Sequence, residues 1–127
     1  MSVFLQRPGN VDPTGAARNT VPAALMPARA RFCNLIVQRI LAFEAFRVNS
    51  ATDADPRPAS AAIAALAHKI AGVGETLGFS RVGQLAATLE QCTRDGLSRH
   101  IPPRELSRDV DPLLDALLDE LERLPEI

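Results

Sequence analysis

One histidine in an alanine-rich stretch is the residue of this sequence best suited to chemistry. His68 lies in residues 66–78, which read LAHKIAGVGETLG, and Gly72 and Gly74 follow it closely. Glycine in a helix interior costs roughly 1 kcal/mol relative to alanine, so two glycines beside a histidine break a local preference. Such breaks are expected at functional sites. Because neutral imidazole is a good nucleophile at cellular pH, His68 is a candidate reactive side chain.

The helix that carries His68 is expected to hold this side chain away from the core. His68 follows Ile63 by five residues, and therefore lies about 140° round the helix axis from it. The predicted buried stripe of this helix is Ile63, Leu66, Ile70, Val73 and Leu77. The surface neighbours of His68 are Ala61, Ala64, Ala65, Ala71, Gly72 and Glu75. Two interpretations stay open: a histidine bared for a protein partner, or an ordinary exposed histidine beside small residues that let helices pack closely.

A second stripe of small and charged residues lies further along the chain. It consists of Gly83, Ala87, Glu90 and Arg94, at steps of four, three and four residues. If the two helices pack side by side, this spacing brings Glu90 and Arg94 next to His68. Lys69 and Arg94 carry positive charge that would steady a transferred anion.

Periodic apolar residues predict four amphipathic helices and no strand. The short connection at Gly78 implies that the second and third helices are antiparallel neighbours. We therefore predict an all-α fold, an antiparallel four-helix bundle over residues 27–127. Residues 1–26 contain three prolines without periodicity, and are predicted to be a flexible N-terminal tail. The predicted helices span about 27–47, 58–77, 81–95 and 103–124.

Particular residues mark the predicted helix ends. Gly78 is placed to end the second helix in a left-handed conformation, and Ser80 is a plausible N-cap for the third. Gly96 is expected to end the third helix, and residues 49–57 are expected to form a polar loop. Pro112 predicts a kink or a short break in the last helix.

Composition and charge exclude several functional classes. The net charge is -1 at pH 7, whereas binding to nucleic acid needs a basic face. Cys33 and Cys92 lack metal-ligand spacing and a clustered histidine, so we expect no metal site and no cofactor. The sequence shows no secretory leader and no apolar run long enough to span a bilayer. We therefore expect no membrane association and a cytoplasmic location.

The residues around His68 resemble the histidine-containing phosphotransfer (HPt) domains of bacterial phosphorelays. The resemblance covers residues 59–95 strongly, and extends over residues 28–124 in helix count and order. It implies a helical bundle whose exposed histidine takes a phosphoryl group from the aspartate of a response-regulator receiver domain, and then passes it to another receiver or returns it. The residues that carry the resemblance are His68, Lys69, Ile70, Ala71, Gly72, Gly78, Leu85, Leu89 and Glu90.

The resemblance also implies roles for individual residues. His68 would be the phosphorylated residue, and Gly72 would leave room beside the phosphate. Lys69 and Arg94 would be electrostatic helpers. Glu90 stands where some members place a glutamine that hydrogen-bonds the other imidazole nitrogen, and a carboxylate there would orient the ring as an acceptor.

The partners implied by the resemblance are response-regulator receiver domains, with a hybrid sensor kinase as a further candidate; we expect the chain itself to be a monomer. In this family the receiver is expected to supply the Mg²⁺ and most of the catalytic groups. Because the sequence has no GxxxxGK(S/T) loop, we expect a phosphotransfer intermediate without kinase activity of its own. Whether such a protein counts as an enzyme stays open.

Two other functions remain as alternatives. Many HPt domains carry lysine three residues after the histidine, where this sequence has Ala71. The first alternative is therefore an HPt-like interaction module that docks a receiver or kinase without being phosphorylated. The second is an enzyme that uses His68 as a general base. Such an enzyme would need a partner nucleophile and a pocket, whereas the residues around His68 predict a flat surface.

Overall fold

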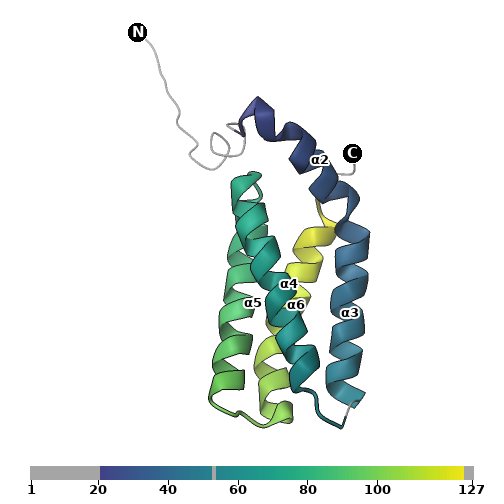
Figure 1. Cartoon of the computed structure of the whole chain (residues 1–127), viewed down its shortest axis with the longest axis vertical. Coiled ribbons are helices and arrows are strands. Elements are labelled where there is room, and N and C mark those ends of the chain that lie inside the picture. The colour runs from purple at the N-terminus through teal and green to yellow at the C-terminus, as the bar shows by residue number, and fades with distance from the viewer. Residues whose placement is uncertain (1–20, 53, 125–127) are drawn as a thin grey trace.

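The computed structural model describes residues 21–52 and 54–124. Within these ranges every regular element is a helix (Figure 1). Four of them, α3 to α6, stand side by side in alternating directions, and α2 crosses one end of this bundle. The prediction of an all-α, antiparallel four-helix bundle is confirmed. The elements are η1 (Ala23–Leu25), α2 (Met26–Asn34), α3 (Ile36–Thr52), α4 (Arg57–Thr76), α5 (Ser80–Ser98) and α6 (Pro103–Glu122).

Most of the predicted flexible tail lies outside the described residues, which begin at Val21. Residues 23–25 form the 3₁₀ helix η1, and Met26 is the first residue of α2. Regular structure therefore begins a few residues earlier than the predicted boundary at residue 27. Pro27 lies in the first turn of α2, where its missing N–H does no harm.

The prediction of one helix over residues 27–47 is wrong in two respects. Leu35 adopts φ -95° and ψ 0°, which separates α2 from α3. Beyond it, α3 continues to Thr52, inside the predicted loop. Asn49, Ser50 and Thr52 suggested a loop, but polar side chains also suit the last turn of a helix. The Thr52 hydroxyl donates a hydrogen bond to the Val48 carbonyl oxygen at 2.9 Å.

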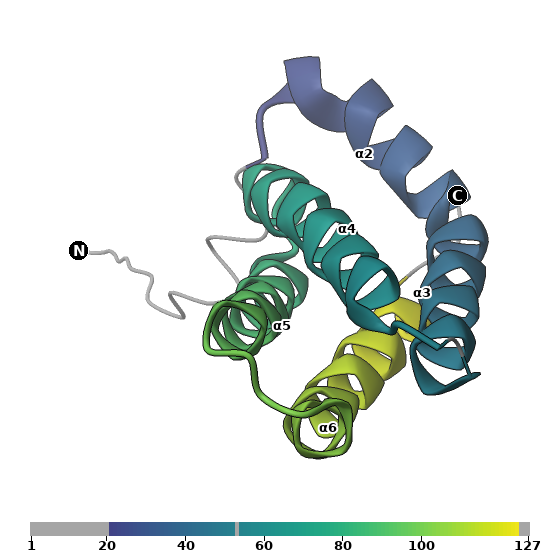
Figure 2. The same ribbon diagram turned by 60° about the horizontal axis from the view of Figure 1, so that its bottom comes forward.

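The bend at Leu35 carries α2 over the turn between α4 and α5 (Figure 2). Phe32 of α2 stacks on Phe79 of that turn, with ring centroids 5.6 Å apart. The Arg29 guanidinium lies 4.5 Å from the centre of the same ring. Because such stacking and cation–π contacts are worth about 0.5–1.5 kcal/mol each, they hold α2 on the end of the bundle.

The closest helix pair is α4 and α5, because two glycines let their backbones meet. A Cβ atom on Gly83 would lie 2.7 Å from Glu75 Cγ and 3.1 Å from Glu75 N. A Cβ atom on Gly74 would lie 3.2 Å from Gly83 N. Neither position has room for a larger residue without movement. The largest fully buried side chains around this contact and in the rest of the core are Phe43, Ile70, Leu89, Leu114, Leu117, Leu121, Val82 and Thr93.

This glycine contact sets the rotation of α4 about its own axis. Gly74 and Ala67 are buried, whereas Val73 is 43% exposed. The prediction that Val73 lies in the core is therefore wrong: the helix turns its small residues inward, so that it can approach α5 closely. Of the predicted stripe, Ile63, Ile70 and the C-cap residue Leu77 are buried, and Leu66 is half-buried against the core.

Gly78 ends α4 as predicted, with φ 88° in the left-handed region. Phe79 N–H donates to the Gly74 carbonyl at 2.8 Å, and Gly78 N–H donates to the Glu75 carbonyl at 3.2 Å. These are the two hydrogen bonds of a Schellman motif. Ser80 is not the N-cap of α5, since Phe79 holds that position and makes no side-chain capping bond. The motif leads the chain directly into α5.

The prediction that Gly96 ends the third helix is wrong. α5 continues to Ser98, and His100 takes the left-handed position with φ 56°. Ile101 N–H donates to the Gly96 carbonyl at 3.0 Å, which completes a second Schellman turn. Glycine at position 96 serves a different purpose, because a Cβ atom there would force the Leu106 side chain of α6 to move.

The last helix, α6, runs from Pro103 to Glu122 without a break at Pro112. Pro112 and Arg108, four residues earlier, are both exposed. Water can therefore satisfy the Arg108 carbonyl that the proline ring leaves without an N–H donor. The inward face of α6 buries Leu106, Val110, Leu114, Leu117, Leu118 and Leu121.

Replacing Gly83 by valine should destabilise the bundle by about 1–3 kcal/mol, because the new side chain meets the backbone of α4. Gly72→Val is the matched control, since a Cβ atom on Gly72 meets nothing within 4 Å. Its stability should stay within about 0.5 kcal/mol of the wild type. Urea denaturation of both variants measures the difference. Equal stability of the two variants would show that α4 and α5 do not meet closely at Gly83.

Candidate functional site

His68 projects from the exposed face of α4, and its side chain is 71% exposed. The strip of small residues around it is narrower than the sequence predicts. Ala64 is fully buried and Ala71 is half-buried, because both turn toward the interior of the bundle. The small residues that remain exposed beside the histidine are Ala61, Ala65 and Gly72.

The imidazole ring of His68 is held from one side by Glu90 of α5. Nδ1 of His68 lies 3.0 Å from Glu90 Oε2 and 3.1 Å from Glu90 Oε1. A carboxylate can only accept a hydrogen bond, so the neutral ring carries its proton on Nδ1 and donates it to Glu90. Nε2 is then the nitrogen with a free lone pair, and it is available to a reaction partner.

Arg94 fixes the Glu90 carboxylate from the next turn of α5. Arg94 Nε donates a hydrogen bond to Glu90 Oε2 at 2.9 Å. This bond lowers the pKa of Glu90; partial burial acts against it, and the hydrogen bond from His68 adds to the lowering. Glu90 therefore stays anionic at neutral pH and remains an acceptor. The residue spacing of the two helices predicts Glu90 and Arg94 beside His68, and the structure brings all three together as a chain of hydrogen bonds.

Gly72 and Lys69 lie on the same exposed face as His68. A Cβ atom on Gly72, one turn beyond the histidine, would meet nothing within 4 Å, so this glycine faces open space. Lys69 is exposed, and its ammonium forms no ion pair with any residue in the ranges 21–52 and 54–124. Neither residue forms a hydrogen bond with the His68 side chain among the residues that the structure describes.

Sequence reasoning missed one residue of this face. Val73 is a large apolar side chain at the edge of the exposed arc of α4. Its spacing from Ile70 and Leu77 suggested the core, because those residues lie three and four positions away. The only signal against burial was Gly74 beside it, since a glycine in a helix can mark a close backbone approach.

The two cysteines offer no competing reactive site. Cys33 is buried and Cys92 is half-buried, and burial raises the pKa of each thiol. A raised pKa disfavours the thiolate, which is the reactive form. Among the residues that the structure describes, no group of three or more His, Cys, Asp or Glu side chains is placed to hold a metal ion.

None of the described helices combines the length and the apolar content that crossing a membrane requires.

Comparison with known proteins identifies the family. The family model described as Hpt domain matches residues 30–126, which is well over half of the chain. A search of curated proteins and a search of solved structures find no match. Hpt domains perform histidine phosphotransfer in two-component phosphorelays and interact with response-regulator receiver domains. The matched residues contain all four bundle helices and the exposed histidine with its Glu90 support, and this chain belongs to the Hpt domain family.

Proposed function

We propose that His68 accepts a phosphoryl group from the aspartate of a receiver domain and passes it to another receiver. One observation carries this proposal: the ring is 71% exposed, and Glu90 holds Nδ1 at 3.0 Å so that Nε2 is left as the nucleophile. The small exposed residues around the ring let a bulky protein approach it. A receiver is such a partner, because it presents its phosphorylated aspartate on its own surface.

The proposed transfer uses few groups of this chain. The Nε2 lone pair attacks the phosphorus of the aspartyl phosphate, the new N–P bond forms, and the bond from phosphorus to the aspartate oxygen breaks. The receiver aspartate leaves as a carboxylate. The imidazole becomes positively charged while its proton stays on Nδ1, and the anionic Glu90 beside it stabilises that charge. The receiver supplies Mg²⁺ and the remaining charge neutralisation for in-line transfer.

Three further residues support the phosphoryl group in this proposal. Gly72 leaves the space one turn from His68 empty, so the three phosphoryl oxygens are not crowded. Lys69 supplies a mobile positive charge on the exposed face of α4. Arg94 contributes mainly through Glu90, because its Nε is already bonded to that carboxylate.

We also propose which part of the chain acts, in which oligomeric state and in which compartment. Residues 27–127 act as one phosphotransfer module, as a monomer in the cytoplasm, with a hybrid sensor kinase as a source of the phosphoryl group. An interaction module that is never phosphorylated is the second candidate. It is favoured by Ala71, whose half-buried methyl group packs against the core where many HPt domains carry a lysine.

Substitution of the histidine separates these two candidates. His68→Gln should abolish labelling by a phosphorylated receiver, because no imidazole nitrogen remains at the site. The control is His100→Gln, which removes the other histidine of the chain and should label like the wild type. Acid-labile radioactive phosphate on the protein is the measurement. An unlabelled wild type that still binds the receiver would favour the interaction module, and equal labelling of His68→Gln and wild type would refute the proposal.

Glu90 should set the transfer rate through the ring tautomer. Glu90→Ala should slow transfer by about tenfold to a hundredfold, since a hydrogen bond to a charged group is worth about 1.5–3 kcal/mol. The transfer rate of Glu90→Gln should lie between those of the wild type and Glu90→Ala, because an amide oxygen still accepts a hydrogen bond from Nδ1–H but carries no charge. Nitrogen NMR should show the Nδ1–H tautomer of His68 in the wild type and its loss in Glu90→Ala. The control is Asp95→Ala, whose carboxylate lies 3.6 Å from Arg99 instead; an identical slowing in this variant would contradict the specific role of Glu90.

Gly72→Val tests the open space beside His68 without disturbing the fold. The variant should keep wild-type stability, but transfer to and from a receiver should slow by at least about tenfold, because a branched side chain occupies the phosphoryl position. Rapid-quench measurement with a purified receiver provides the rate. Transfer at the wild-type rate would show that the phosphoryl group does not lie over Gly72.

A further inference from the structure

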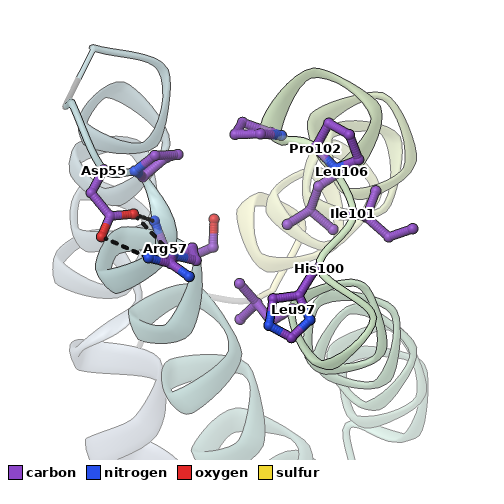
Figure 3. Close-up of a pocket in the computed structure, with 10 residues that line it drawn as sticks. Asp55, Arg57, Leu97, His100, Ile101, Pro102 and Leu106 are labelled. Atoms are coloured by element: carbon purple, nitrogen blue, oxygen red, sulfur yellow. Dashed lines mark hydrogen bonds and ion pairs between the residues drawn. The ribbon is translucent and has the colours of Figure 1, made fainter.

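A cavity lies at the end of the bundle opposite α2, away from the face of His68. It opens between the start of α4, the end of α5 and the start of α6, and its volume is about 180 Å³. Figure 3 shows Asp55 and Arg57 on one side of it and Leu97, His100 and Ile101 on the other. Ser60, which lines this cavity, and His68 are eight residues apart on α4, or about 12 Å along the helix axis.

The floor of this cavity is apolar. Leu97, Ile101 and Leu106 line it together with the prolines at the starts of α4 and α6. A dry apolar cavity of about 150 Å³ is known to hold benzene in another protein, so the space suits a molecule of roughly six to ten non-hydrogen atoms. The apolar lining favours a ligand whose body is a ring or a branched hydrocarbon.

The hydroxyl of a largely buried serine is accessible from this apolar space. Ser60 is only 7% exposed and lines the cavity. Its hydroxyl takes part in none of the side-chain hydrogen bonds among the residues that the structure describes. This hydroxyl is therefore free to donate a hydrogen bond to a ligand in the cavity.

The electrostatics of the cavity favour a negatively charged group. The N-termini of two long helices, α4 and α6, meet at it. Asp55 Oδ1 accepts a hydrogen bond from the Arg57 N–H at the start of α4, whereas Pro102, the N-cap residue of α6, makes no side-chain capping bond. Helix N-termini carry partial positive charge that attracts anions. α5 ends at the same place, but its last carbonyls accept hydrogen bonds from His100 N–H and Ile101 N–H.

Among the charged side chains that line the cavity, Arg57 is best placed to hold an anion. Its guanidinium now forms an ion pair with Asp55. Arg57 Nε lies 3.1 Å from Asp55 Oδ1, and both side chains are more than half exposed. Asp55 also accepts a hydrogen bond from the Arg57 backbone N–H at 3.2 Å. Because these contacts are exposed to water, an incoming anion competes with Asp55 for the guanidinium. Asp55 therefore acts as an internal competitor for the guanidinium.

We propose that this cavity binds a small organic acid. Its hydrocarbon part fills the space over Leu97, Ile101 and Leu106. Its carboxylate takes the place of Asp55 on Arg57 and accepts a hydrogen bond from the Ser60 hydroxyl. This site is separate from the phosphotransfer histidine, and its existence does not depend on the function proposed for His68.

The test is a titration of the full chain with benzoate. Isothermal calorimetry measures the affinity, and amide NMR shifts locate the binding site. Two control compounds are titrated in the same way. Benzamide keeps the ring but carries no charge, and inorganic phosphate is charged but has no hydrocarbon part. Benzoate should bind with a dissociation constant in the millimolar range or below, as expected for so small a ligand. Benzamide and phosphate should each bind at least about fivefold more weakly. Shifts should centre on Ser60, Leu97 and Ile101.

Variants of the ion pair sharpen the test because they change affinity in opposite directions. Arg57→Gln should weaken benzoate binding by at least about fivefold, whereas Asp55→Asn should strengthen it about twofold or more by releasing the guanidinium. Arg99→Gln is the matched control, since it removes one positive charge from the same end of α5 without lining the cavity. No binding at about 10 mM benzoate, equal binding of benzamide or phosphate, or equal effects of Arg57→Gln and Arg99→Gln would each overturn the proposal.

Discussion

The close approach of α4 and α5 at Gly83 is the constraint on which the functional site depends. At this point the backbone of α5 lies so near α4 that a Cβ atom would come within 3.1 Å of Glu75 N. Seven residues further along α5 is Glu90, and seven residues back along α4 from Glu75 is His68. Because seven residues are nearly two full helical turns, the same faces meet again at that level. The hydrogen bond between His68 and Glu90 is thus set by the glycine contact in the core.

The chemistry of the histidine depends on that register through a short electrostatic chain. Arg94 holds Glu90, Glu90 holds the Nδ1 proton of His68, and Nε2 is left to react. None of these groups stores energy for the transfer; they remove the choice between two tautomers and two ring orientations before the partner arrives. The helix face around the ring stays bare, which in the proposed function leaves room for the receiver and its metal ion. A four-helix bundle with rigid packing at its centre is well suited to this limited task.

The sequence predicted the four helices of the bundle, though not all of their ends, and the approach of Glu90 to His68, because both follow from residue spacing along neighbouring helices. It did not predict the exposure of Val73 or the burial of Ala64. Those positions depend on how α4 rotates to bring Gly74 against Gly83, which is a contact between distant segments. The bend at Leu35 has a similar cause, because the stacking of Phe32 on Phe79 draws α2 across the bundle. The prediction that Gly96 ends the third helix failed for a related reason. Gly96 makes room for the Leu106 side chain, and His100 forms the turn instead.

The nitrogen that carries the phosphoryl group tests the central claim most directly. Phosphorus and nitrogen NMR of the chain, labelled by a phosphorylated receiver, assign the phosphoryl group to a residue and to one of its ring nitrogens. The geometry of His68 and Glu90 predicts phosphorus bonded to Nε2 of His68, with the proton still on Nδ1. Phosphorus on Nδ1 of His68, or on any other residue, would contradict the account.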